Sequence, residues 1–106
     1  MKFRCERDVL VDAFTSAARA VGSRAALPVL SGVRLSLQGD QLRLTGSDLD
    51  LTIDVVTTVS GASDGTAVVP ARLGADILRA LEPGAVSIVI EGEQAQISAG
   101  RSLFSV

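Results

Sequence analysis

The chain has 106 residues, 47% of them hydrophobic and 21% charged, which fits one folded domain with a single core and excludes a disordered chain. It has no histidine, so it lacks the commonest general base. Its one cysteine cannot form an internal disulfide, as expected of a protein in the reducing cytoplasm. No apolar run could span a membrane, the N-terminus is not a signal peptide, and the net charge of −2 argues against binding nucleic acid through bulk charge.

The first segment predicts a strand followed by a helix. Residues 1–6 alternate between apolar and charged side chains, which is typical of a strand with one buried face. Apolar residues then recur at helical spacing as far as Val21, with Asp8 as the expected N-cap and Gly22 as the expected end of the helix. A connector containing proline, which disfavours helix just before it, follows.

The next stretch predicts a meander of three short antiparallel strands with one apolar face. Leucines alternate with polar residues, and a two-residue turn at Gly39–Asp40 sets Leu35 opposite Leu44. A second turn is expected at Gly46–Ser47, which would set Leu44 opposite Leu49. Both turns agree on one register, and a one-residue slip would expose the whole leucine set to water.

The second half repeats this pattern, because residues 33–46 match residues 86–99 in both turn and apolar face. A surface loop is expected at 61–65, then a short strand and a helix that begins behind Pro70. A hairpin and a last strand over 101–106 complete the copy. The sequence therefore predicts an α+β fold of duplicated βαβββ units, with two helices packed on antiparallel sheets.

Residues 48–52 have the pattern D-x-D-x-T, which looks like the nucleophile motif of haloacid-dehalogenase-type phosphatases. In that chemistry Asp48 would form an aspartyl-phosphate, and Asp50 would act as acid/base, with Mg²⁺ bound to both. That chemistry needs a buried parallel strand before the motif, and the second copy lacks both carboxylates. A turn aspartate and a surface aspartate are the favoured interpretation. Cys5 has no histidine to activate it, which favours a core thiol over a nucleophile.

The second helix carries Arg72 and Arg79 on one face, roughly 10 Å apart along its axis. The predicted apolar stripe consists of Leu73, Ile77 and Leu81. The two arginines could follow a phosphate backbone, or Asp76 between them could pair with both on an ordinary solvated surface. From these residues alone the solvated surface is favoured. The sequence predicts no metal site and no cofactor.

Five segments, in order along the whole chain, closely resemble the first domain of the bacterial DNA polymerase III beta subunit family, the sliding clamps. They are MKF at the start, RAALPVL from Arg24, LTGSDLDL from Leu44, VPARLGADILRAL from Val69 and GRSLFSV from Gly100. By this resemblance, residues 1–106 are expected to be an N-terminal domain that is truncated at its C-terminal end and lacks the later domains.

The resemblance implies a non-catalytic processivity factor of the cytoplasm, without cofactor or metal. Family members form a head-to-tail homodimeric ring that encircles duplex DNA regardless of its sequence, with the helices facing the DNA. DNA polymerase III and the clamp loader would bind through domains absent here. The resemblance implies DNA contacts at Arg24 and Arg72, with Arg79 nearby. It implies a joint with the second subunit at Leu73, Ile77, Arg101, Leu103 and Phe104.

The chain departs from the family at this joint. Family members often carry a basic residue at Leu73 and at Leu103, and bulky residues at Gly74 and Ala75, which argues against charge pairing across the joint here. The repeat register gives Phe104 a core position, so it should lie at the rim of the core. Two alternatives to the clamp stay open: a phosphatase fragment using Asp48 and Asp50, and an interaction module that binds no DNA.

Overall fold

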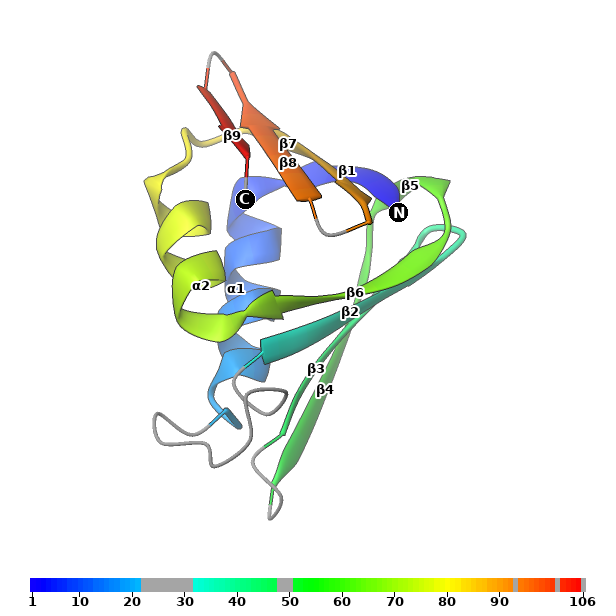
Figure 1. Cartoon of the computed structure of the whole chain (residues 1–106), viewed down its shortest axis with the longest axis vertical. Coiled ribbons are helices and arrows are strands. Elements are labelled where there is room, and N and C mark those ends of the chain that lie inside the picture. Colours follow the sequence, from blue (N-terminus) through cyan, green and yellow to red (C-terminus); the bar gives the residue numbers. More distant parts are fainter. Residues whose placement is uncertain (22–31, 48–50, 93, 101, 106) are drawn as a thin grey trace.

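The computed structural model describes residues 1–21, 32–47, 51–92, 94–100 and 102–105 (Figure 1). The described helices are α1 (Arg7–Ala18) and α2 (Ala71–Ala80). The described strands are β1 (Lys2–Glu6), β2 (Gly32–Gln38), β3 (Gln41–Ser47), β4 (Thr52–Thr58), β5 (Ser60–Ser63), β6 (Gly65–Pro70), β7 (Ala85–Glu91), β8 (Gln94–Ala99) and β9 (Ser102–Ser105).

The strands form two antiparallel sheets, one in the order β5-β1-β7-β8-β9 and the other in the order β4-β3-β2-β6. The two halves of the chain exchange a strand, because β1 pairs with β7 of the second half and β6 pairs with β2 of the first half. In Figure 1, α1 and α2 lie side by side where the two sheets diverge. This confirms the predicted α+β fold with two helices packed on antiparallel sheets, and the exchange makes the two halves one body.

The first predicted hairpin is confirmed and the second turn is wrong. Leu35 pairs with Leu44 across a turn in which Gly39 has a φ of 61°. β3 continues through Gly46, and Leu44 pairs with Val55 of β4. The reason is tertiary: a Cβ on Gly46 would overlap the backbone carbonyl of Ala17 in α1. The glycine permits close approach of helix and strand instead of forming a turn. The predicted partner at position 49 lies outside the described residues.

The predicted loop at 61–65 is also wrong, since β5 forms an edge strand paired with β1. Two aspartates tie this segment to the first hairpin. Asp40 Oδ1 accepts a hydrogen bond from the Gly61 N–H at 2.9 Å, and Asp64 Oδ1 accepts one from the Gly39 N–H at 2.8 Å. Small polar residues that suggest a loop therefore belong to a strand that two aspartate–backbone hydrogen bonds hold against the first hairpin.

Helix α1 begins and ends earlier than the sequence predicts. Glu6 is the N-cap residue in an extended conformation, and its side chain makes no capping hydrogen bond. Asp8 lies in the first turn instead, where a carboxylate interacts favourably with the helix dipole. β1 runs directly into the helix, which leaves no room for a later start. The helix ends at Ala18, and the predicted stop at position 22 lies outside the described residues.

The buried face of α2 differs from the predicted stripe. Gly74, Ala75 and Leu78 are buried, whereas Leu73 is 47% exposed and Ile77 is half-buried. The ring of Phe14 in α1 lies so close to Gly74 that an added Cβ would overlap it. Helix α2 therefore presents its small residues to α1. Of the predicted stripe only Leu81, just beyond the helix, is fully buried.

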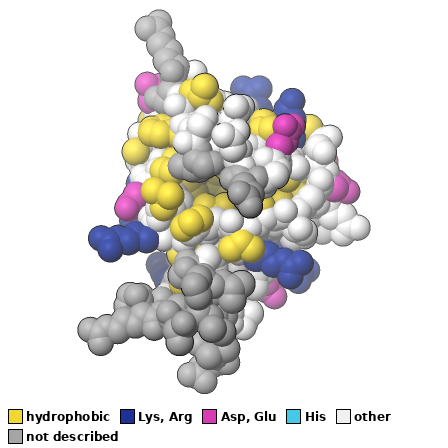
Figure 2. Space-filling model, in the orientation of Figure 1, with side chains coloured by type: hydrophobic (Ala, Val, Ile, Leu, Met, Phe, Trp, Pro, Cys, Tyr) yellow, Lys and Arg dark blue, Asp and Glu magenta, His cyan; other side chains and the backbone are white. Residues whose placement is uncertain are grey.

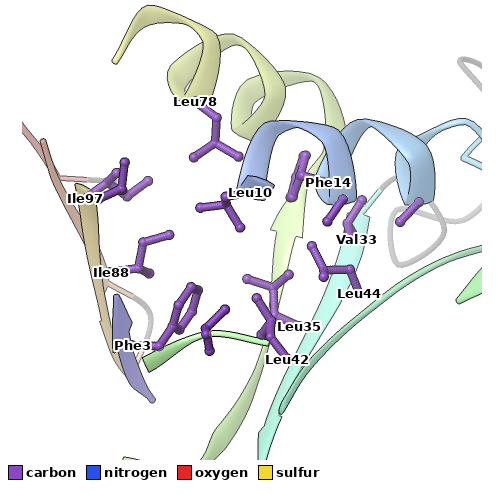
Figure 3. Close-up of a cluster of buried hydrophobic side chains, with 14 of the residues drawn as sticks. Phe3, Leu10, Phe14, Val33, Leu35, Leu42, Leu44, Leu78, Ile88 and Ile97 are labelled. Atoms are coloured by element: carbon purple, nitrogen blue, oxygen red, sulfur yellow. The ribbon is translucent and has the colours of Figure 1, made fainter. Parts of the chain in front are cut away.

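A single apolar core fills the space between helices and sheets. Figure 3 shows Leu10 of α1 pointing into the centre of this cluster, with Leu78 of α2 on one side and Ile97 of β8 on another. Phe3, Phe14 and the leucines of the first hairpin are 4% exposed or less. No polar or charged residue is buried among the described residues. Burial of large side chains from every layer is the main source of stability here.

Candidate nucleic-acid interface and subunit joint

The two helices run antiparallel on the side where the sheets diverge. At one end of the pair, the Arg7 backbone N–H donates a hydrogen bond to the carbonyl of Gly84 at 2.8 Å, just beyond α2. Near the middle, Phe14 meets Gly74. The start of α1 therefore lies beside the end of α2, and the end of α1 lies beside the start of α2. The side chains that each helix turns away from the core form the outer surface of this pair.

Arg72 and Arg79 lie on this surface, and both are exposed. The alternative in which Asp76 pairs with both is not formed: in the described part of the chain, the ion pairs are Arg7–Asp8 and Arg43–Asp54. Two guanidinium groups on one helix face are thus available to anions from outside, as phosphate contacts require. The third predicted DNA contact, Arg24, lies outside the described residues.

The predicted joint residues lie at the opposite flank of α2 and on β9. Leu73 is 47% exposed and Leu103 is 65% exposed. Ile77 and Phe104 are half-buried and pack against the core, so Phe104 lies at the rim of the core as predicted. Phe104 pairs with Ile97 of β8 across the strand ladder. Arg101 lies outside the described residues.

An apolar cavity of about 450 Å³ lies between α2, β6 and the β7–β8 hairpin. Its lining includes Val68, Pro70, Leu73, Ile77, Ile90 and Ala95. Ile97, the strand partner of Phe104, also lines it, which connects the cavity to β9. Figure 2 shows hydrophobic side chains gathered on this face over α2 and towards β6. Sequence periodicity missed this cavity because it predicted that Leu73 and Ile77 would face the core.

β9 and β5 are the edge strands of one sheet, and β4 and β6 are the edge strands of the other. The outer side of an edge strand carries backbone donors and acceptors that a further strand can pair with. On β9 that edge runs beside the exposed Leu103. An unpaired edge beside exposed apolar residues is the arrangement that strand addition by another chain uses.

Other candidate sites of the sequence give no assembled chemistry. Burial, followed by the nearby Glu6 carboxylate, raises the pKa of the Cys5 thiol to about 11, so this thiol is a poor nucleophile at neutral pH. Cys5 packs against the core, as the core-thiol interpretation predicts.

In the described ranges, no three His, Cys, Asp or Glu side chains come together as metal ligands. Neither α1 nor α2 has the length and apolar character of a membrane span.

Comparison with known proteins decides the family. The model of the DNA polymerase III beta subunit, N-terminal domain, matches residues 1–106. The chain belongs to this family. The beta sliding clamp of Streptomyces coelicolor is 39% identical over 100% of this chain and 28% of its own length. The beta sliding clamp of Vibrio cholerae is 36% identical over 100% of this chain and 30% of its own length.

A solved structure supports the same assignment. A sliding clamp (DNA polymerase III subunit beta) from Pseudomonas aeruginosa superposes with a TM-score of 0.91 at 36% identity, over 99% of this chain and 29% of that one. The chain thus spans about three-tenths of the length of these DNA polymerase III beta subunits.

Membership of the DNA polymerase III beta family gives the phosphatase alternative no support. Asp48 and Asp50 lie outside the described residues. The strand that precedes them, β3, pairs antiparallel with both β2 and β4. The phosphatase motif requires a buried parallel strand at this place. The structural context that would make the two carboxylates catalytic is therefore missing from the described sheet.

Proposed function

We propose that this chain is the first domain, residues 1–106, of a longer sliding clamp that encircles duplex DNA and tethers the replicative polymerase. The match of the whole chain to the N-terminal domain of the family carries this proposal. The chain covers about three-tenths of the length of its relatives, which supports a role for further domains in closing the ring. The function is topological, takes place in the bacterial cytoplasm, and uses no catalytic residue, metal or cofactor.

The outward faces of α1 and α2 are the surface proposed to face DNA. Arg72 and Arg79 are exposed there without an ion-pair partner among the described residues. Arg24 joins them by resemblance. Contacts of this kind go to phosphates, so they do not read sequence and are weakened by salt. A clamp that slides needs both properties.

The joint with the second subunit is proposed to lie on α2 and β9, through Leu73, Ile77, Arg101, Leu103 and Phe104. The exposed leucines and the adjoining cavity support an apolar contact. The free edge of β9 supports extension of the sheet across the joint. Arrangement of two complete subunits head to tail would close the ring. DNA polymerase III and the clamp loader would bind through the remaining domains.

Retention on circular DNA tests the proposal. The complete protein is loaded onto primed circular DNA by its clamp loader, and the bound fraction is separated by gel filtration. Retention on circles and loss after linearisation are expected, because a ring leaves DNA only over an end. Equal retention on both forms would instead favour the interaction module, whose binding does not depend on DNA topology.

Loss of a proposed phosphate contact gives a second test. Arg24→Ala and Arg72→Ala in the complete protein should each flatten the slope of log K against log salt by about one. Arg34→Ala is a matched control, because Arg34 is exposed on β2 with its side chain directed away from the helices. An unchanged slope in both variants would assign Arg24 and Arg72 to an ordinary solvated surface.

A further inference from the structure

We propose that Arg19 is a further DNA-contacting residue, and that phosphate contacts concentrate at the end of the helix pair where α1 ends and α2 begins. This inference rests on the proposed clamp function. Arg19 is the C-cap residue of α1 and is exposed. It lies off the predicted apolar stripe, and the resemblance assigns it no role.

The antiparallel packing places Arg19 and Arg72 at the same end of the pair. Taking the contact of Phe14 with Gly74 as the origin, Arg19 lies about 7.5 Å further along α1, at 1.5 Å per residue. Arg72 precedes Gly74 by about 3 Å along α2. Because the helices run in opposite directions, both displacements point to the same end. Arg79 is displaced by about 7.5 Å towards the other end.

The charges on α1 reinforce this polarity. Its buried face consists of Leu10, Ala13, Phe14 and Ala17, and Asp8, Asp12 and Arg19 project from the opposite face. The two carboxylates lie on the Arg79 side of the Phe14 contact, and Arg19 lies on the Arg72 side. Asp8 is already paired with Arg7 at 3.5 Å, so Asp12 is the carboxylate that opposes phosphate at the Arg79 end, and a phosphate backbone is attracted more strongly at the Arg72 end.

Local roles do not account for the Arg19 side chain. Its backbone N–H donates to the Thr15 carbonyl at 3.2 Å, so the backbone alone completes the last turn. Within the described part of the chain its guanidinium makes no ion pair. Asp12, the nearest acidic residue on the same face, is about 10 Å away along the axis, which is beyond ion-pair distance. The group is free to bind an anion from outside.

The test is equilibrium binding of the complete protein to a fluorescently labelled primer–template duplex, measured by anisotropy between 50 and 200 mM salt. Loss of one phosphate contact lowers the salt slope by about 0.9, so the ratio of wild-type to variant affinity changes by about 3.5-fold across this range. We expect this change for Arg19→Ala and for Arg72→Ala, and a smaller one for Arg79→Ala. Arg19→Lys should keep the wild-type slope, and Asp12→Asn should tighten binding at low salt.

The control is again Arg34→Ala, which removes one exposed positive charge from the outer sheet face and should leave the slope unchanged. A flattened slope for Arg19→Ala, with the control unchanged, supports the inference. If Arg72→Ala flattens the slope while Arg19→Ala matches the control, the role of Arg19 is overturned and the clamp function stands. If wild-type binding shows no dependence on salt, the inference and the proposed DNA contacts are overturned together.

Discussion

The two helices of this domain bury different kinds of apolar residue where they meet. Helix α1 buries large side chains, with Leu10 and Phe14 no more than 2% exposed. Helix α2 buries Leu78 but meets α1 through Gly74 and Ala75, and it leaves Leu73 47% exposed. The first helix therefore supplies the core of its own domain. The second leaves apolar surface exposed, which is where the proposed joint lies.

One contact explains the difference. The Phe14 ring occupies the place that a side chain at position 74 would need. With that space filled from α1, α2 packs through its small residues and its larger ones turn towards the cavity beside β6. A large residue on one helix thus decides which face of its neighbour stays free.

Phe14→Ala should lower the free energy of unfolding by about 3–5 kcal/mol, because it removes a ring that both helices pack around and leaves a cavity. The measurement is urea denaturation of this chain. The matched control on the same helix is Val9→Ala, at a side chain that is 43% exposed, with an expected change within about 0.5 kcal/mol. Similar losses in the two variants would contradict the assignment of α1 to the core.

Gly46→Ala should lower the free energy of unfolding by about 1–3 kcal/mol, since its Cβ would meet the backbone of α1 and neither segment can yield easily. Gly74→Ala should cost less. There the obstacles are side-chain atoms of Phe14 and Val69, which can shift more readily than backbone, and alanine is the better helix former by about 1 kcal/mol. Thermal unfolding of the two variants decides the order. A larger loss for Gly74→Ala would place the tightest helix contact at α2.

Cys5 should react slowly with iodoacetamide at pH 8. With its pKa raised from 9.0 to about 11, its thiolate fraction is about 100-fold smaller than that of an ordinary cysteine. The folded chain also holds the Cys5 proton more tightly than the unfolded chain does. The resulting contribution to the free energy of unfolding is fully present below pH 9 and is lost as the pH rises from 9 to about 11. Alkylation in urea is the control. Equal rates in the folded and unfolded chain would show that β1 is not sheltered.

Leu73→Ser should lower the free energy of unfolding of this chain by no more than about 1 kcal/mol, because Leu73 is already 47% exposed. In the complete protein it should nevertheless weaken the proposed joint and shift the dimer towards monomer in sedimentation experiments. Val9→Ser, at a similar exposure on α1, is the matched control and should leave the dimer intact. Equal effects of both variants on the dimer would remove the distinction between the helices.

Part of the candidate site was predictable from sequence and part was not. Arg72 and Arg79 lie on the exposed face of α2 as the helical spacing predicts. The sequence did not predict that their charges are available, because the spacing of Asp76 allows an ion pair with either arginine. Among the described residues, no such pair forms. Arg19 could have been noticed from its place opposite the apolar stripe. Its place at the same end of the helix pair as Arg72 depends on the antiparallel packing of two segments far apart in the chain.

The sequence by itself determined the features that depend on near neighbours. The Gly39–Asp40 turn and the leucine alternation set the register of the first hairpin, and Pro70 marks the start of α2. Only the tertiary structure decided that β1 and β6 exchange sheets, that Gly46 lies within a strand, and that α2 turns Leu73 outwards. Alternation and turn chemistry act over a few residues and leave their signal in the local sequence. Strand exchange and helix rotation depend on which distant side chain fills a given space, and that is settled only when the whole core packs.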